Sequence, residues 1–218
     1  MTNKRVLSKI GMIILIYLVV LVLPGWILQL FKLRGALAIN LQVAITAVGT
    51  LVLILVDRST DRQLGLAPAP KLSIADKTLY GVAGMFLLFA VEIVCSLTII
   101  LIFGQQTQSQ NTQEILQIVK MAPAFVIYAV VLAPMMEEIV FRKNIYGVGR
   151  TLINPLGAAL TSALLFGLAH NDNHYLIVYA GLGLALCWLF RRTKSITANI
   201  VAHGLFNGIT MALALLVH

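Results

Sequence analysis

The chain has 218 residues, of which 60% are hydrophobic and 11% are charged. A soluble domain carries about 25% charged residues, so this composition excludes an ordinary soluble globular protein. The net charge of +8 would suggest a nucleic acid partner in a soluble protein. Here the basic residues lie in short loops between long apolar runs, where they set topology and meet anionic lipid. The composition therefore predicts a lipid bilayer, and no nucleic acid, as partner.

Seven apolar runs are predicted to be membrane helices, because a helix needs about 20 residues to cross a bilayer. They are 10–31, 35–56, 78–103, 114–147, 152–169, 175–190 and 196–217. The stretch 57–77 is the longest polar connection, and Pro68 and Pro70 should interrupt any helix there. The fold class is therefore predicted to be all-α, a polytopic membrane helical bundle that forms a single domain, 1–218.

Positively charged residues gather on one side of these seven runs. Those before residue 10, in the 57–77 connection, at 142–150 and at 191–194 fall on the same side, and only Lys32 and Arg34 fall on the other. Cytoplasmic loops carry an excess of Lys and Arg. The chain is therefore predicted to be a multi-pass protein of the cell membrane, with a cytoplasmic N-terminus and an external C-terminus.

Two adjacent carboxylates, Glu137 and Glu138, directly follow the apolar stretch 121–136. An ionised carboxylate at the bilayer centre costs about 3 kcal/mol or more, so such groups face a protein interior or a wet cavity. On a helix, Glu138 and Arg142 lie four residues apart on one face and can form an ion pair. Glu137 points roughly 100° away from Glu138 and is available for another role.

Further polar residues lie at helical spacing inside the later apolar runs. His170 ends the fifth run, four residues after Phe166. The last run contains Asn199, His203 and Asn207 at steps of four, which places them along one helix face. Such groups either hold helices together by hydrogen bonds, the role we expect for Asn199 taken alone, or serve a function. A set drawn from three helices favours a function.

Other polar residues are expected to have structural roles. Glu92 in the third run should face the bundle interior, paired or protonated. Asp172 and His174, just beyond His170, are expected in a solvated turn. Cys95 and Cys187 lie in apolar segments without the spacing of a metal site or a disulfide framework.

Glu137, His170, His203 and Asn207 have the chemistry that peptide hydrolysis requires. A carboxylate or an imidazole can act as the general base for an attacking water. An imidazole N–H and an asparagine amide can stabilise the oxyanion that forms. Alternatively, Glu137, His170 and His203 could hold Zn²⁺ with an open fourth position. The zinc alternative is the weaker one on spacing alone, because the sequence lacks H-E-x-x-H.

Three motifs in order resemble those of a known family. Glu137-Glu138-x-x-x-Arg142, Phe166-x-x-x-His170 and His203-x-x-x-Asn207 are similar to the motifs of the CAAX-protease and bacteriocin-processing family of intramembrane peptidases, the CPBP or Abi family. The first motif alone is a weak pattern, but three in order, each in an apolar helix, are specific. The resemblance covers about 125–207, within a catalytic core predicted at about 115–217.

The resemblance implies a role for each matching residue. Glu137 with His170 would activate the hydrolytic water, while His203 and Asn207 would stabilise the oxyanion. The supporting residues would be Glu138 and Arg142, which organise the site, and Phe166, which packs beneath it. The resemblance favours a glutamate-dependent mechanism without a cofactor, with zinc as the alternative.

The predicted function is therefore an intramembrane endopeptidase that hydrolyses a peptide bond of a membrane-associated peptide or protein substrate. Eukaryotic members of the family remove the last three residues of prenylated CaaX proteins, and many small bacterial members are linked to bacteriocin immunity or processing. A chain this short resembles the bacterial kind. One alternative is a non-catalytic bacteriocin-immunity membrane protein that binds a toxin or its receptor. An ion or proton transporter is less favoured, because the sequence lacks inverted repeats.

Overall fold

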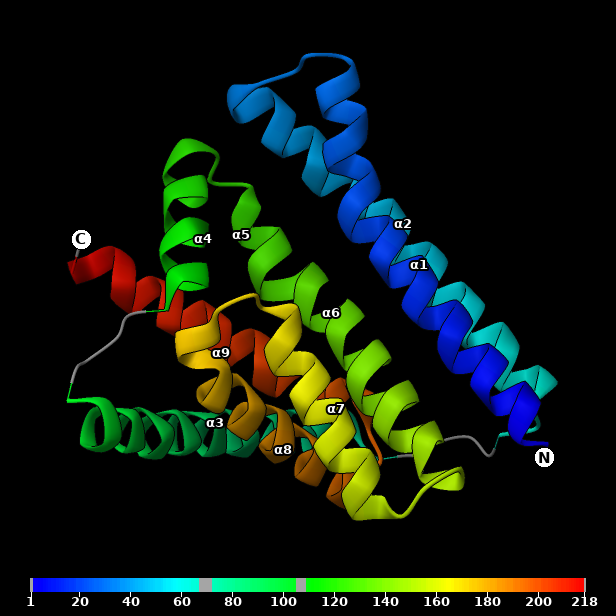
Figure 1. The fold of residues 1–218 in the computed structure, drawn as a ribbon. Helices are drawn as coiled ribbons and strands as arrows, with labels where there is room; N and C mark the ends of the chain where they lie inside the picture. Colours follow the sequence, from blue (N-terminus) through cyan, green and yellow to red (C-terminus); the bar gives the residue numbers. More distant parts are fainter. Residues whose placement is uncertain (1, 67–71, 105–108, 218) are drawn as a thin grey trace.

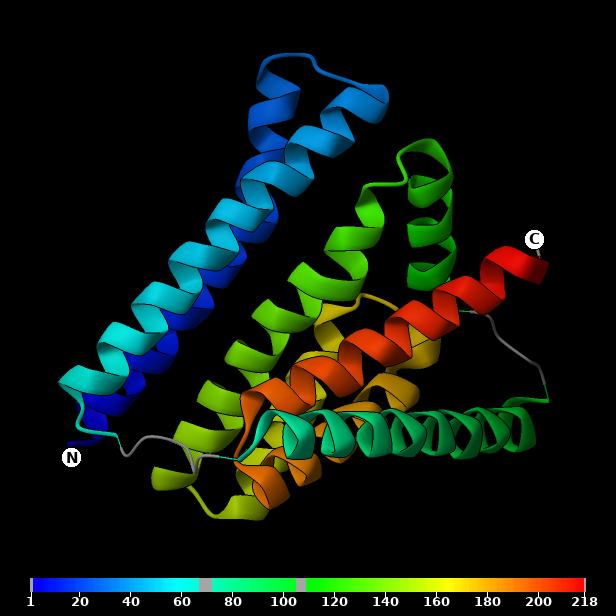
Figure 2. The same ribbon diagram turned by 180° about the vertical axis from the view of Figure 1, so that it is seen from behind.

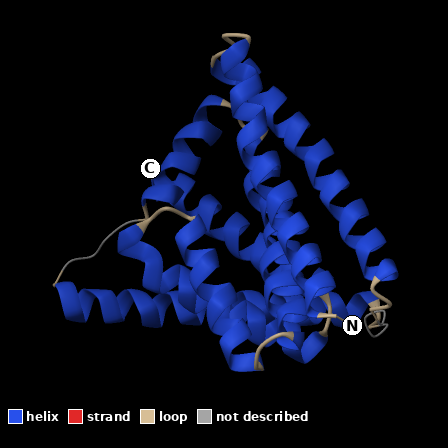
Figure 3. Cartoon of the chain, turned by 45° about the vertical axis from the view of Figure 1, so that its right-hand side comes forward, coloured by secondary structure: helices blue, strands red, loops and turns tan. Residues whose placement is uncertain are grey.

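The computed structural model describes residues 2–66, 72–104 and 109–217. Within these residues every regular element is a helix (Figure 3), so the predicted all-α class is confirmed. The predicted interruption at Pro68 and Pro70 lies outside the described residues, as does the middle of the glutamine-rich loop that follows the third run.

Seven of the helices are α1 (Asn3–Leu30), α2 (Gly35–Gln63), α3 (Ile74–Phe103), α4 (Gln110–Met121), α7 (Pro155–Ala169), α8 (Leu176–Thr193) and α9 (Ile196–Val217), and a short 3₁₀ turn, η4 (Asn173–Tyr175), precedes α8. Between α4 and α7 one continuous helix carries the paired glutamates, and we call it the motif helix, 125–151. Its consecutive parts are α5 (Phe125–Ile127), η1 (Tyr128–Leu132), α6 (Ala133–Glu137), η2 (Glu138–Val148) and η3 (Gly149–Thr151).

The helices are arranged around the motif helix (Figures 1 and 2). The antiparallel hairpin of α1 and α2 lies along one side of it, and α7, α8 and α9 lie on the other. α3 packs against both α8 and α9. α4 stands at the C-terminal end of α9, beside the start of the motif helix. The motif helix therefore lies between the hairpin of α1 and α2 and the group of α7, α8 and α9.

Five helical segments of the described residues are long and apolar enough to cross a membrane. They are Asn3–Leu30, Gly35–Gln63, Ile74–Ile102, Asn173–Thr193 and Ile196–Leu216. α7 has 15 residues, fewer than the about 20 that a span needs. The chain is thus a multi-pass helical membrane protein, while the count of seven spans stays a prediction.

The first two helices extend beyond their predicted ends. α1 begins at Asn3 rather than at residue 10, and α2 continues to Gln63 rather than stopping at 56. The predicted ends at residues 10 and 56 are wrong, because the neighbouring charged residues Lys9 and Asp57 are buried and form an ion pair, with Lys9 Nζ 3.3 Å from Asp57 Oδ1. A charge that meets its counter-charge inside the bundle does not end a helix.

A larger charge cluster surrounds that ion pair, and it consists of Lys9, Asp57, Asp61, Lys143 and Asn144. The two lysines each contact both aspartates. The side-chain amide of Asn144 donates to Asp57 Oδ1 at 2.9 Å. Since Lys143 and Asn144 belong to the motif helix, the charge cluster attaches the hairpin of α1 and α2 to the helix that carries the paired glutamates.

The predicted fourth run, 114–147, is divided in two. α4 ends at Met121, and Ala122 has extended backbone angles, φ −142° and ψ 92°. The residue before a proline is disfavoured in helical conformation, and Pro123 follows Ala122, so the helix cannot continue smoothly. The single span was therefore wrong at its start, and the motif helix begins only after this break.

A second proline shapes the motif helix itself. In the π-helical turn η1 the backbone N–H groups reach five residues back, and that of Ala133 donates to the carbonyl of Tyr128. Pro134 has no N–H to donate in the same way to the carbonyl of Ala129. That carbonyl instead accepts a hydrogen bond from Asn207 Nδ2 of α9 at 3.0 Å. The proline thus exposes a main-chain acceptor to the neighbouring helix.

Gly204 allows the two helix backbones to come this close. A Cβ atom at this position would lie 2.6 Å from the backbone oxygen of Val130, closer than real Cβ contacts allow. Gly204 follows His203 in α9, so the same close approach brings His203 beside the paired glutamates.

We therefore expect Gly204→Ala to destabilise the protein and Gly208→Ala to be tolerated. Gly208 faces the same neighbour, but its Cβ would meet Val130 Cγ1 at an ordinary 3.5 Å. Overpacking costs about 1–3 kcal/mol, whereas alanine in place of a helical glycine gains up to about 1 kcal/mol. Thermal unfolding of both purified variants in detergent measures the difference, and equal midpoints would show that α9 does not depend on this approach.

Removing one member of the charge cluster should also destabilise the protein. Asp57→Ala leaves Lys9 and Lys143 with one carboxylate between them, and breaking a buried ion pair from one side costs about 3–5 kcal/mol. The matched control is Glu114→Gln, which removes an exposed carboxylate. The unfolding midpoint in detergent should fall for Asp57→Ala alone, and a midpoint equal to that of the control would contradict the attachment.

Candidate active site

The Glu138 side chain is completely buried and has three polar partners. Its Oε1 accepts a hydrogen bond from His203 Nδ1 at 2.9 Å, and its Oε2 accepts one from Asn199 Nδ2 at 3.1 Å. Arg142 Nη1 lies 3.4 Å from Oε1 and forms the predicted ion pair. These partners offset the desolvation of a buried carboxylate. Two of them lie on α9, so Glu138 also fixes how α9 sits against the motif helix.

Arg142 is completely buried as well, but it has fewer partners. Its guanidinium lies over the ring of Phe166, with Cζ 3.9 Å from the ring centroid. Among the described residues none forms a hydrogen bond of good geometry with its three nitrogens, so the ion pair with Glu138 and the ring face neutralise its charge. Phe166 therefore packs directly beneath the ion pair.

His203 lies between the two glutamates of the motif helix. Its Nδ1 is bound to Glu138, and its Nε2 lies 3.7 Å from Glu137 Oε2, too far for a hydrogen bond. The Glu137 side chain keeps 15% of its surface exposed, whereas that of Glu138 has none. The adjacent carboxylates thus have different environments: Glu138 orients the imidazole, and Glu137 remains accessible at its other edge.

The tautomer of His170 follows from the hydrogen bond of its Nδ1 atom. Its Nδ1 lies 2.8 Å from the carbonyl of Phe166, which can only accept, so Nδ1 carries the hydrogen. In the neutral ring Nε2 then holds a lone pair. The ring stacks on that of Tyr179, with centroids 3.9 Å apart and an angle of 21°. His170 is therefore held as an imidazole whose free nitrogen can accept a proton.

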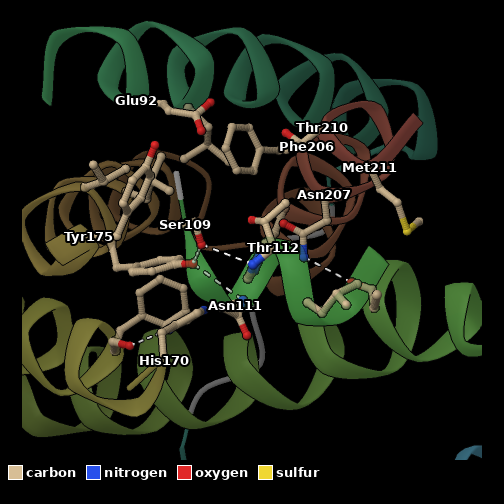
Figure 4. Close-up of a pocket in the computed structure, with 18 of the residues that line it drawn as sticks. Glu92, Ser109, Asn111, Thr112, His170, Tyr175, Phe206, Asn207, Thr210 and Met211 are labelled. Carbon is tan, nitrogen blue, oxygen red and sulfur yellow. Dashed lines mark hydrogen bonds between the residues drawn. The ribbon is translucent and has the colours of Figure 1, made fainter. Parts of the chain in front are cut away.

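His170, His203 and Asn207 line one cavity, together with Phe166. Figure 4 shows His170 and Asn207 on its wall. Its volume of about 90 Å³ is enough for several water molecules. Glu137 is not among the residues that line it, and lies instead beside His203. The structure therefore brings three of the four predicted catalytic residues to one cavity and places the fourth next to one of them.

Several polar residues at this cavity were not predicted. The Tyr179 hydroxyl forms a hydrogen bond with Ser109 Oγ at 2.9 Å, and it accepts another from the Asn111 side-chain amide at 3.4 Å. Asp172 was expected in a solvated turn, and this was wrong: it is 2% exposed and accepts from the backbone N–H of Gln110 at 2.9 Å. These contacts join the segment 109–111 at the start of α4 to α8 and to the turn between α7 and α8. They connect residues 62 to 70 positions apart, so local spacing could not reveal them.

The residues named for a zinc site do not converge as ligands. Among the described residues, no three His, Cys, Asp or Glu side chains are grouped closely enough to hold a metal ion. His203 uses Nδ1 on Glu138, and His170 uses Nδ1 on a carbonyl, so each has one nitrogen left. Zinc needs ligands at about 2 Å around one point, and this arrangement does not provide them.

The fold and the site together define a multi-pass helical membrane protein that buries a cluster of carboxylates and imidazoles between its helices. A family model described as "Type II CAAX prenyl endopeptidase Rce1-like" matches residues 119–209. The chain is 34% identical over 164 residues to "Putative membrane peptidase YdiL" of Bacillus subtilis (strain 168), covering 75% of this chain and 67% of that protein. It is 30% identical over 190 residues to "Membrane-embedded CAAX protease MroQ" of Staphylococcus aureus (strain USA300), covering 84% and 76%. No solved structure matches.

The chain therefore belongs to the CAAX protease family of membrane peptidases. The family predicted from the three motifs is confirmed, and it implies that the protein is a peptidase.

The unequal number of partners of Glu138 and Arg142 gives a test of the site's construction. Glu138→Leu leaves the buried guanidinium of Arg142 without its counter-charge, so it should lower the free energy of unfolding by about 3–5 kcal/mol. Arg142→Met should cost less, because Glu138 keeps His203 and Asn199. The double variant should be more stable than Glu138→Leu alone. Unfolding midpoints in detergent for this double-mutant cycle measure the coupling, and additive effects would show that the two charges do not depend on each other.

Proposed function

We propose that this protein is an intramembrane endopeptidase that hydrolyses a peptide bond of a membrane-associated substrate at the cavity lined by His170, His203 and Asn207. The observation that carries this proposal is the placement of two imidazoles and an amide around one cavity of about 90 Å³, with a partly exposed carboxylate beside it. Membership of a peptidase family supports it.

Glu137 and His170 are the proton acceptors for the attacking water. His170 has its lone pair on Nε2, because Nδ1–H is fixed on the Phe166 carbonyl. Glu137 is a carboxylate that keeps part of its surface exposed. A base of either type removes a proton from water as its oxygen attacks the carbonyl carbon, and returns the proton to the amine when the C–N bond breaks. No metal takes part in these steps.

His203 and Asn207 stabilise the oxyanion from one face of α9. The Asn207 amide has two hydrogens, and one of them is used on the Ala129 carbonyl, which leaves the other for the substrate oxygen. His203 is oriented by Glu138 and donates from Nε2 when its ring is protonated. Donors fixed in this way need no reorganisation as the negative charge develops. Glu138, Arg142 and Phe166 act through these residues by holding them in place.

The substrate is a membrane-associated peptide or protein with an apolar segment near the cleaved bond. Most of the cavity wall is apolar, with Leu88, Val178, Leu182 and Leu186 among its residues. We further propose that the protein acts in the cell membrane with a cytoplasmic N-terminus, as the positions of its basic residues indicate. We propose bacteriocin processing or immunity as its biological setting.

Hydrolysis of a membrane-presented fluorogenic peptide by the purified protein tests this proposal. Glu137→Ala and His203→Ala should each lower kcat at least about 100-fold, the usual contribution of a general base or an oxyanion donor. Glu114→Gln, on the exposed face of α4, is the matched control and should retain activity. Unchanged turnover in Glu137→Ala would remove the assignment. A toxin-protection phenotype that survives in Glu137→Ala would instead identify a non-catalytic immunity protein.

A further inference from the structure

Glu92 of α3 lines this cavity, whereas Glu137 and Glu138 do not. Figure 4 shows its side chain on the wall opposite His170. Among the described residues that line the cavity, Glu92 is the one carboxylate, and none is a lysine or an arginine. The proposed hydrolysis makes no use of Glu92. It does not organise the catalytic residues either, because it forms none of the contacts that hold His170, His203 or Asn207.

Glu92 is only partly buried, and it lacks the ion pairs that the fully buried Glu138 and Asp57 form. Glu138 has an arginine, an imidazole and an amide, and Asp57 has two lysines. No ion pair joins Glu92 to a basic residue of the described chain. Its neighbours on the wall include Leu88 and Phe206, which are almost completely buried. A carboxylate in an apolar membrane helix is costly and normally indicates a function.

Aromatic rings line the wall beside this carboxylate. Tyr175, Tyr179 and Phe206 all line the cavity, and Figure 4 shows Tyr175 and Phe206 next to Glu92. The faces of aromatic rings attract cations, most strongly where water is excluded. A carboxylate attracts a cation by direct charge, and also accepts its hydrogen bonds. The two features together favour an ammonium or guanidinium group over a neutral or acidic one.

We infer that Glu92, with Tyr175 and Phe206, forms a subsite for a cationic group of the substrate, such as a lysine or arginine side chain. This inference rests on the proposed peptidase function. Because the subsite and the catalytic residues line one small cavity, the cationic residue lies within a few positions of the cleaved bond. An acidic residue at the same position is disfavoured, since it would meet Glu92 with like charge.

A peptide series measures this preference. Fluorogenic peptides share one apolar membrane segment and carry lysine, norleucine or glutamate at each of the three positions on either side of the cleaved bond. At one position the wild type should cleave the lysine peptide with a kcat/KM about tenfold or more above that of the norleucine peptide, as a charge-assisted hydrogen bond allows. Glu92→Gln should bring this ratio close to one, whereas Glu92→Asp should keep part of it. The control Glu114→Gln should leave the ratio unchanged.

A binding measurement separates the subsite from the peptidase activity. n-Hexylammonium should raise the unfolding midpoint of the wild type in detergent more than n-hexanol does, and Glu92→Gln should abolish the difference. If no peptide is cleaved but this difference is found, the peptidase proposal fails and the cation subsite stands. If peptides are cleaved without a lysine preference that depends on Glu92, the subsite is wrong and the peptidase stands. Equal shifts in wild type and Glu92→Gln also overturn the subsite.

Discussion

The burial of the Glu138 carboxylate is the constraint on which the rest of the site depends. A negative charge in a dry helix bundle is stable only where hydrogen-bond donors and a counter-charge surround it. Arg142 comes from the next turn of the same helix, but Asn199 and His203 come from α9. The hydrogen bonds that Glu138 needs therefore set the rotation of α9 about its own axis and its position along the motif helix. The imidazole that reaches the cavity is held in place by a requirement for stability, which makes its orientation independent of the substrate.

The local departures from regular helix serve the same contact. Pro134 cannot donate to the Ala129 carbonyl, and Asn207 takes that acceptor. Gly204 removes the side chain that would otherwise separate the backbones. The eleven-residue π-helical part η2 follows directly at Glu138. π-Helical turns are uncommon and occur frequently at functional sites. The sequence thus uses a proline and a glycine, both poor helix formers, where two helices must meet.

Much of the fold and part of the site could be predicted from the sequence, because charges inside apolar runs are few and therefore conspicuous. The all-α bundle followed from composition, and the Glu138–Arg142 ion pair followed from a spacing of four. Contacts between distant segments could not be found this way. The sequence places Lys9 and Asp57 in loops, but the structure shows them as an ion pair. Asp172 was expected in a solvated turn, but it accepts a hydrogen bond from the backbone at the start of α4. Sequence spacing shows which residues share a helix face, but not which face of another helix they meet.

The contact at Gly204 also limits how the bundle can open. At Gly204 the backbones of α9 and the motif helix are in direct contact, with no side chains between them that could rearrange. A sliding motion of α9 along the motif helix would therefore break the hydrogen bond between His203 and Glu138. The part of the cavity wall that α4 forms has fewer buried side chains. α4 is a short helix that buries only Leu116 and Val119, and it meets the motif helix through a proline break. The α4 wall of the cavity is therefore held by fewer buried side chains than the α9 wall, and in the proposed peptidase α4 is the side that would yield to a substrate peptide.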